Sequence, residues 1–214
     1  MIDIAVVDYG MGNLRSVSKA LEHVAPNKNV VVTSQPADIK QASRVVFPGQ
    51  GAMPDCMREL ESRGLRDAIV DAAATKPFLG ICIGLQLLFE HSEEGDAAGL
   101  GILSGNVKRF SANEMHDETG NKLKVPHMGW NQVYQTQTHP MWNDIADGER
   151  FYYVHSYYVQ PQDENLIAGV TEYPKRFTGA IAHRNIFAVQ FHPEKSQHAG
   201  LQLLANFVKW NGQA

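Results

Sequence analysis

The feature that most restricts the fold of this 214-residue chain is a short apolar run that ends in a cysteine flanked by glycines. Residues 77–82 read Pro-Phe-Leu-Gly-Ile-Cys, which predicts a short buried strand. Gly80 and Gly84 stand two residues before and after Cys82. A nucleophile on a tight strand-to-helix turn needs small residues at these flanking positions, because the backbone is crowded there. The sequence therefore predicts a nucleophile elbow, with Cys82 as the candidate nucleophile.

Leu85, Leu88 and Phe89 follow at helical spacing and predict that a helix continues from this elbow. The N-terminus of that helix would face Cys82, and its dipole would favour thiolate over thiol. The alternative is a structural cysteine buried beside packing glycines. Other parts of the chain must decide between the two.

Strand and helix patterns alternate over residues 1–95. Strands are predicted at Ile2–Val7, Val30–Thr33 and Arg44–Phe47, with a polar loop after the second. Helical faces are formed by Leu14, Val17, Leu21 and Val24, and by Met57, Leu60, Leu65, Ile69 and Val70. This alternation predicts an α/β fold with a doubly wound, mostly parallel central sheet flanked by helices.

After Gly101 the helical periodicity fades and short strands dominate. These are expected at Val107–Phe110, Phe151–Val159, Thr178–Ala182 and Ile186–Gln190, with a polar hairpin-like loop at Ser111–Asn121. A last helix carries Leu201, Leu204, Ala205, Phe207 and Val208 on its apolar side. We expect the late strands to extend the same sheet in antiparallel fashion, so that residues 1–214 form one domain.

The composition argues against several classes of function. A net charge of −4 gives no reason to expect a nucleic-acid partner. Two cysteines form neither a disulfide framework nor a zinc set, and they suit a reducing cytoplasm. The N-terminus lacks a signal-peptide pattern, and no apolar run approaches the roughly 20 residues of a membrane span. The sequence thus predicts a cytoplasmic protein without a metal or membrane contact.

Two further stretches complement the elbow. Small residues at Pro48–Met53 follow a strand and would let backbone N–H groups form an oxyanion hole, although a plain turn has the same composition. His192 and Glu194 follow the last strand and would supply a base and the carboxylate that orients it. A surface turn is the alternative for this pair. An elbow cysteine together with a His-x-Glu at a strand end is more specific than either alone.

These residues resemble a known family. Gly80–Gln86 together with Gln190–Glu194 resembles the class I (triad) glutamine amidotransferases, and Pro48–Gly51 resembles their oxyanion strand. Asp8–Val17 and Val125–Asn131 narrow the resemblance to the glutaminase subunits of imidazole glycerol phosphate synthases. The similarity covers essentially the whole chain and implies a glutamine amidotransferase type 1 domain over residues 1–214.

The resemblance implies the reaction. Glutamine would be hydrolysed to glutamate through a thioester on Cys82, with His192 as base and then acid and Glu194 orienting it. Ammonia would pass to a partner, a (β/α)₈-barrel cyclase in a heterodimer. That partner would form imidazole glycerol phosphate and an aminoimidazole carboxamide ribonucleotide, in histidine biosynthesis. No cofactor is implied.

The family pattern also implies residues that bind glutamine. These are Gly49, Gln50, Gly51, Gln86, Glu94, His155, Ser156 and Tyr157. Gln50 departs from the family, in which an aliphatic residue is common. Gln86 and Glu94 would lie at the start and end of the helix after the elbow and suit a zwitterionic amino acid. Glu94 also reads as one member of a solvated acidic run, and residues 155–157 as an ordinary strand.

Asn13, His127 and Trp130 are the residues that the resemblance assigns to the partner interface, for which aromatic residues are also favoured. A turn histidine and a core aromatic are the alternatives. Three functions remain to be compared: this glutaminase, another amidotransferase or thiol hydrolase on the same fold, and a non-catalytic scaffold subunit. The intact Cys82, His192 and Glu194 argue against the scaffold.

Overall fold

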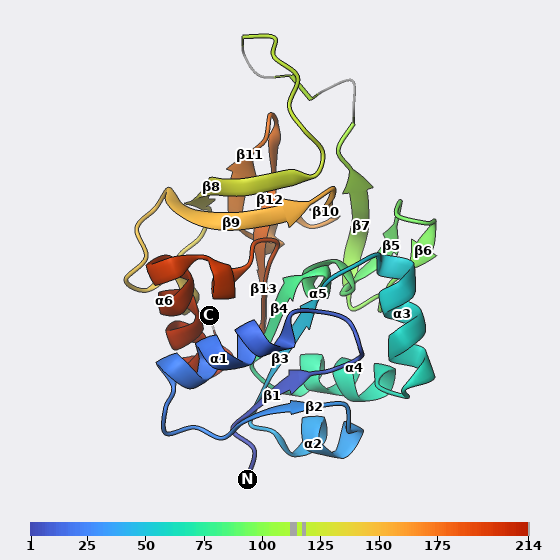
Figure 1. The fold of residues 1–214 in the computed structure, drawn as a ribbon, viewed down its shortest axis with the longest axis vertical. Coiled ribbons are helices and arrows are strands. Elements are labelled where there is room, and N and C mark those ends of the chain that lie inside the picture. Colours follow the sequence, from blue (N-terminus) through green and yellow to red (C-terminus); the bar gives the residue numbers. More distant parts are fainter. Residues whose placement is uncertain (112–114, 117–118, 214) are drawn as a thin grey trace.

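The computed structural model describes residues 1–111, 115–116 and 119–213 (Figure 1). The strands are β1 Ile4–Val7, β2 Val30–Thr33, β3 Arg44–Gly49, β4 Phe78–Cys82, β5 Phe89–Ser92, β6 Ala97–Ala98, β7 Leu103–Arg109, β8 His127–Gln135, β9 Glu149–His155, β10 Tyr157–Pro161, β11 Ile167–Glu172, β12 Arg176–His183 and β13 Ile186–Val189. The helices are α1 Leu14–Val24, α2 Pro36–Gln41, α3 Met53–Ser62, α4 Arg66–Thr75, α5 Ile83–Gln86 and α6 Gln197–Lys209. Short 3₁₀ helices are η1 Pro140–Trp142, η2 Glu164–Leu166 and η3 Pro193–Lys195.

The sheet has a parallel half and an antiparallel half, as expected from the sequence. Its order begins β2-β1-β3-β4-β13, with parallel pairing throughout, and continues through β12, β10 and β7. The step from β1 to β2 runs opposite to the later steps, so right-handed crossovers place α1 and α2 on opposite faces. α1 packs against α6, and α2 packs against α4. The fold is therefore a doubly wound α/β fold (Figure 1).

The antiparallel half closes over the carboxyl edge of the parallel strands. β8 pairs with β9 and with β11, and β8 and β9 form a ribbon above α5 and β13 (Figure 1). This placement matters because ligands of such sheets bind beyond the carboxyl ends of the parallel strands.

The sequence predicted that the helix after the elbow would continue, and this prediction is wrong beyond the first helical turn. α5 ends at Gln86, and Phe89 begins strand β5, which pairs in parallel with β7. Leu85, Leu88 and Phe89 are all fully buried. Their spacing reflects burial on every side and not the single apolar face of a helix.

The structure differs from three other expectations of the sequence. The loop predicted after Thr33 contains helix α2, which starts with Pro36 at a position where a missing N–H costs nothing. The strand predicted at Phe151–Val159 is divided at Ser156, because β9 and β10 pair with different neighbours. The last strand, β13, ends at Val189. The polar loop at Ser111–Asn121 lies partly outside the described residues.

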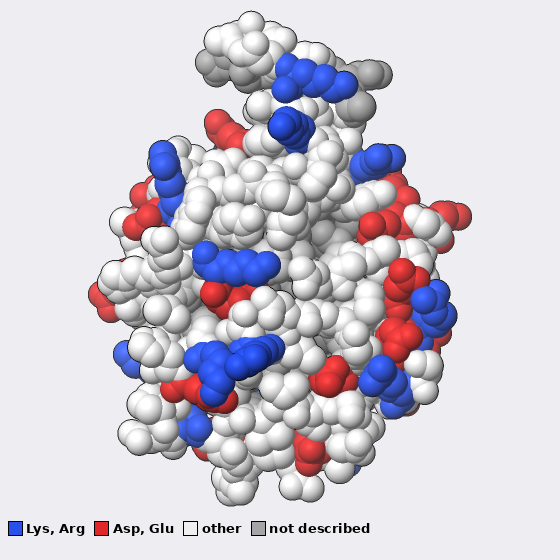
Figure 2. All heavy atoms as spheres, in the orientation of Figure 1, with Lys and Arg blue, Asp and Glu red and all other residues white. Residues whose placement is uncertain are grey.

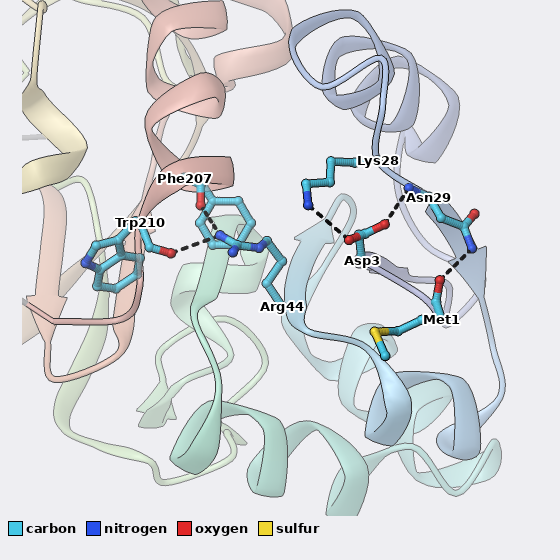
Figure 3. Close-up of polar contacts among 7 residues, drawn as sticks. All are labelled: Met1, Asp3, Lys28, Asn29, Arg44, Phe207 and Trp210. Carbon is cyan, nitrogen blue, oxygen red and sulfur yellow. Dashed lines mark hydrogen bonds and ion pairs between the residues drawn. The ribbon is translucent and has the colours of Figure 1, made fainter.

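Arg44 joins the first residue of β3 to the end of α6 (Figure 3). Its Nη1 donates to the carbonyl oxygens of Phe207, at 2.6 Å, and Trp210, at 2.9 Å. The guanidinium also lies over the Phe207 ring, 5.8 Å from the centroid. Because the last carbonyls of a helix lack partners within it, this arginine caps α6. Beside it, Asp3 accepts hydrogen bonds from Lys28 and from the Asn29 backbone (Figure 3).

Candidate active site

Cys82 occupies the elbow that the glycine pattern predicted. It is the last residue of β4 and has φ 57° and ψ −112°, a strained backbone for a residue with a side chain. A Cβ at Gly84 would lie 1.8 Å from the carbonyl oxygen of Phe47, and one at Gly80 would lie 2.9 Å from the Cβ of Ala188. Glycine is therefore required on both sides for β3, β4 and β13 to approach the turn.

His192 and Glu194 form a buried pair beside the elbow. His192 Nδ1 lies 2.9 Å from Glu194 Oε1, and the two side chains are 5% and 1% exposed. A carboxylate only accepts, so Nδ1 carries the proton and Nε2 is left as the basic atom. Nε2 is buried and has no hydrogen-bond partner among the described residues. This leaves it available for a substrate or for Cys82.

The charge of Cys82 couples to this histidine. Burial on its own would lower the pKa of His192, but the charge of the nearby Cys82 sulfur, together with the Glu194 carboxylate, raises it to about 10. A thiolate and an imidazolium thus stabilise each other, as in cysteine enzymes that use a histidine base. The arrangement can move a proton from the sulfur to the imidazole.

A cavity of about 220 Å³ opens onto both groups. It is lined by Gln50, Gly51, Cys82, Ile83, Gln86, Glu94, Pro126, Val154, His155, Ser156, Tyr157 and His192. All but one of the substrate-binding residues expected from the sequence line it. Gly49 is the exception, since it pairs with Cys82 in the sheet beneath. Ile83, Pro126 and Val154 were not among the expected site residues, because they carry no polar side-chain group that would have marked them.

The turn after β3 packs against Tyr9 and Cys56 on its buried side. Gly51 has φ 110°, and a Cβ at Gly49 would lie 2.2 Å from Tyr9 Oη. The Cys56 thiol lies 3.8 Å from the carbonyl oxygen of Gln50, which accepts its hydrogen bond. Burial raises the pKa of the Cys56 thiol to about 11. Cys56 therefore supports the turn as a neutral thiol inside α3.

Gln86 and Glu94 have specific partners. Gln86 Nε2 donates to the Tyr157 carbonyl oxygen, at 3.1 Å, while its Oε1 is buried and has no partner among the described residues. Glu94 Oε2 accepts from the backbone N–H of Met53, at 2.8 Å, at the start of α3. Since the helix after the elbow is one turn long, Glu94 reaches the cavity from the turn that follows β5 and not from a helix end.

The three residues expected at a partner interface differ in exposure. Asn13 caps α1 by accepting from the Ser16 backbone N–H, at 3.4 Å. Trp130 is 44% exposed on β8, near Met128, which is 62% exposed. His127 is 3% exposed and so presents no surface in this conformation. Its ring stacks on Tyr173, with centroids 3.9 Å apart.

The described residues offer no candidate for a metal site or a membrane-spanning helix. Within these ranges no group of three or more His, Cys, Asp or Glu side chains could hold a metal ion. No helix among them is both long and apolar enough to cross a membrane. Basic and acidic side chains are intermixed on the face shown in Figure 2. That face does not present the one-sided positive charge that nucleic-acid binding requires.

Comparisons with known proteins identify the family of this chain. The family model for glutamine amidotransferase class-I matches residues 5–210. The imidazole glycerol phosphate synthase subunit HisH of Thiobacillus denitrificans is 70% identical over 98% of this chain and 92% of its own length. The subunit of the same name from Aromatoleum aromaticum is 65% identical over 98% of this chain and 99% of its own length.

Solved structures share the fold. A glutamine amidotransferase superimposes with a TM-score of 0.71 at 13% identity, covering 96% of this chain and 99% of its own. Another glutamine amidotransferase, from Thermotoga maritima, gives a TM-score of 0.60 at 16% identity, covering 90% of this chain and 76% of its own. At such low identity these likenesses concern the fold alone.

Proposed function

The chain belongs to the class I glutamine amidotransferase family, and on this premise we propose that it is the glutaminase subunit of an imidazole glycerol phosphate synthase. It hydrolyses glutamine to glutamate and delivers the ammonia to a cyclase subunit in histidine biosynthesis. The observation that carries the proposal is the strained Cys82 elbow facing the buried His192–Glu194 pair across one small cavity.

The reaction starts at the sulfur. Cys82 attacks the side-chain amide carbon of glutamine, and His192 takes the thiol proton through Nε2. His192 then returns a proton to the leaving nitrogen, so that ammonia departs and a thioester remains on Cys82. Water, activated by the same imidazole, hydrolyses the thioester to glutamate. Glu194 keeps the proton of His192 on Nδ1 throughout.

The cavity supplies the remaining groups. Backbone N–H groups of the Gly49–Gly51 turn stabilise the oxyanion of the tetrahedral intermediates. Gln86 Oε1, which has no partner within the described part of the chain, accepts from the substrate, and the second carboxylate oxygen of Glu94 faces its ammonium group. His155, Ser156 and Tyr157 border the opposite wall, where the chain changes from β9 to β10. A volume of about 220 Å³ suits an amino acid.

The partner is a (β/α)₈-barrel cyclase bound as a heterodimer through β8. Met128 and Trp130 are large exposed apolar residues on that strand, of the kind that anchor interfaces. Asn13 lies at the start of α1, and the buried His127 acts by supporting β8 from within. The cytoplasm is the expected compartment, because Cys56 and Cys82 are both free thiols.

The catalytic part is tested by measuring glutamate release from glutamine with the purified chain and its cyclase. Cys82→Ala should abolish release, keep partner binding and leave the cyclase able to use added ammonium. Cys56→Ser is the matched control: it removes the second thiol but keeps a donor for the Gln50 carbonyl oxygen, so it should retain release. A glutamine-like electrophile should label Cys82 alone in mass spectrometry. Labelling of Cys56, or full activity of Cys82→Ala, would contradict the assignment.

The interface part is tested by pull-down and titration with the cyclase. Trp130→Ala should weaken binding by about tenfold or more, as expected for an aromatic anchor. Val32, 41% exposed on β2, supplies the control Val32→Ala, which should bind normally. Equal affinities for the two variants would place the partner on another surface.

A further inference from the structure

Gln190 is a fully buried polar residue that directly follows β13, and its Nε2 lies 3.8 Å from Cys82 Sγ. We infer that its side-chain amide is a catalytic hydrogen-bond donor to the nucleophilic sulfur, and that a chain of hydrogen bonds running to Asn131 on β8 fixes its orientation. This inference rests on the proposed function, because it takes Cys82 as the nucleophile.

The orientation of the amide follows from a neighbour that can only accept. The carbonyl oxygen of Tyr157 lies 3.1 Å from the amide of Gln86, so the atom facing it must be nitrogen. The same Nε2 lies 3.0 Å from the amide of Gln190, which must therefore turn its oxygen toward Gln86. That places the Gln190 N–H group on the side of Cys82.

A second branch ends on the same carbonyl. His155 Nδ1 lies 2.8 Å from Tyr157 O, so Nδ1 carries the proton and His155 Nε2 accepts. His127 Nδ1, 3.0 Å away, is then the donor, and its Nε2 accepts from Asn131 Nδ2, at 3.3 Å. Asn131 Nδ2 also donates to the carbonyl oxygen of Glu172, at 2.9 Å. The carbonyl oxygens of Tyr157 and Glu172, at the two ends of this branch, can only accept hydrogen bonds. They therefore decide which nitrogen carries the proton in each imidazole ring and which way the Asn131 amide points.

Burial keeps both imidazoles neutral, as this chain of hydrogen bonds requires. His155 and His127 are 6% and 3% exposed, and His127 is stacked between Tyr153 and Tyr173. Burial lowers the pKa of His127 to about 4 and that of His155 to about 3. If His155 were protonated, its Nε2–H would point at the Nδ1–H of His127, and the two rings could not form a hydrogen bond. The neutral pair therefore holds Tyr157 in place, and Tyr157 holds Gln86 and Gln190.

The Gln190 donor matters most when the sulfur is charged. Hydrogen bonds to an ionised partner are shorter and about twice as strong as neutral ones. In this resting geometry the N–H lies at long range from Sγ and would tighten as the thiolate forms. His192 removes the proton on one side, and Gln190 stabilises the remaining charge from the other. The sequence places Gln190 at the end of a buried strand and at the start of the Gln190–Glu194 stretch, but it gives the side chain no role.

The first test follows the alkylation of Cys82 by iodoacetamide against pH, with mass spectrometry to read that site alone. Gln190→Leu removes the donor, and Gln190→Glu keeps the shape but replaces the donor with an acceptor. Both should move the alkylation curve to higher pH, with the rate near neutral pH falling on the order of tenfold for Leu and further for Glu. Asn206→Leu is the control, because Asn206 is a buried amide that bonds the carbonyls of Met141 and Asn143, away from the site. Its curve should match the wild type.

An unchanged alkylation curve in folded Gln190→Leu or Gln190→Glu would overturn the inference while leaving glutamine hydrolysis assigned to Cys82. Conversely, a shifted curve in a chain that releases no glutamate would uphold the donor and refute the proposed function. The two failures are therefore distinguishable.

The second test needs no variant of the amide. ¹⁵N-labelled histidine NMR on the wild-type chain should find His127 and His155 neutral at about pH 7 with the proton on Nδ1 in both rings. His127→Phe, which retains an aromatic ring between the two tyrosines, assigns the signals. It should also slow alkylation of Cys82, less than Gln190→Leu does. A proton on Nε2 of either ring would break the proposed chain of hydrogen bonds.

Discussion

At the scale of single residues, surroundings and not residue type separate the two thiols. Cys82 stands on a strained turn beside His192 and opens onto the cavity. Cys56 is fully buried in α3, where desolvation raises its pKa to about 11. A thiolate is the reactive form of cysteine, so only one of the two is suited to attack glutamine.

The members of the His192–Glu194 pair should contribute unequally. In the proposed mechanism His192 moves protons in both half-reactions, whereas Glu194 orients the ring and stabilises its charge. His192→Ala should reduce kcat for glutamate release by about 10²–10⁴. Glu194→Gln should lose much less, because the amide oxygen can still accept from Nδ1. Since losses within such a unit do not add, the double variant should resemble His192→Ala alone. Near-wild-type rates in both single variants would exclude the pair from the mechanism.

At the scale of elements, the site depends on how closely β3 approaches the elbow. Gly49 ends β3 beside Cys82, and a side chain there would meet Tyr9 Oη at 2.2 Å and Ile83 Cβ at 2.9 Å. The turn that we propose as the source of the oxyanion N–H groups is therefore packed tightly on its buried side and open toward the cavity.

Gly49→Ala should displace this turn and reduce kcat by about 10²–10³, the usual loss for one oxyanion donor. Tyr9→Phe removes the atom that the new Cβ would meet, so the double variant should recover part of the activity. Gly64→Ala is the control: Gly64 has a positive φ, of 64°, but nothing lies within 4 Å of its Cβ position. This variant should lose stability and keep its rate. A fully active Gly49→Ala would contradict the role of the turn.

The Arg44 cap makes a separate prediction about α6. Arg44→Met removes two hydrogen bonds to helix carbonyls and should lower the free energy of unfolding by about 1–3 kcal/mol. Urea unfolding followed by circular dichroism measures this change. Arg58→Met is the matched control, because Arg58 makes an exposed pair with Asp55 worth at most about 1 kcal/mol. Equal losses for both would show that the cap does not stabilise α6.

At the scale of the whole molecule, one sheet carries both halves of the site. The parallel strands β3, β4 and β13 bring the Gly49–Gly51 turn, Cys82 and the His192 segment to one edge. The antiparallel strands β9 and β10 then close the cavity, beside which His127 and His155 are buried, while His139 is buried against Phe187 and Trp210. Burial thus leaves these three imidazoles neutral inside the protein near pH 7.

Stability should consequently depend on pH. Burial lowers the pKa of His127 and His139 to about 4 and that of His155 to about 3, below the ordinary value of 6.5. Between about pH 4 and 6.5 the unfolded chain binds more protons than the folded one, so stability should fall as the pH is lowered. Each histidine adds about 1.4 kcal/mol per pH unit to this slope. Urea unfolding at several pH values measures it.

The matched variant is His139→Asn, which removes one titrating group but keeps an acceptor for the Met141 backbone N–H. It should flatten the slope between about pH 4 and 6.5. His192 acts in the opposite direction, because its folded pKa is raised: its contribution is complete below pH 6.5 and is lost as pH rises toward 10. A slope unchanged by His139→Asn would refute this account.

The sequence by itself determined the α/β class, the elbow at Cys82 and the His192–Glu194 pair. Those features depend on neighbouring residues: glycines two positions from a cysteine, or a histidine two positions from a glutamate. Local backbone geometry and side-chain chemistry act over that range, so the pattern is visible in the chain.

Only the tertiary structure decided the length of α5, the division between β9 and β10, the burial of His127 and the orientation of the Gln190 amide toward Cys82. Each depends on partners far away in the chain. Gln86 and Gln190 are separated by 104 positions, and His127 and His155 by 28. The sequence does not distinguish an apolar residue that is buried on all sides from one on the apolar face of a helix. The direction of a buried amide is likewise set by the acceptor opposite it, which folding alone brings into contact.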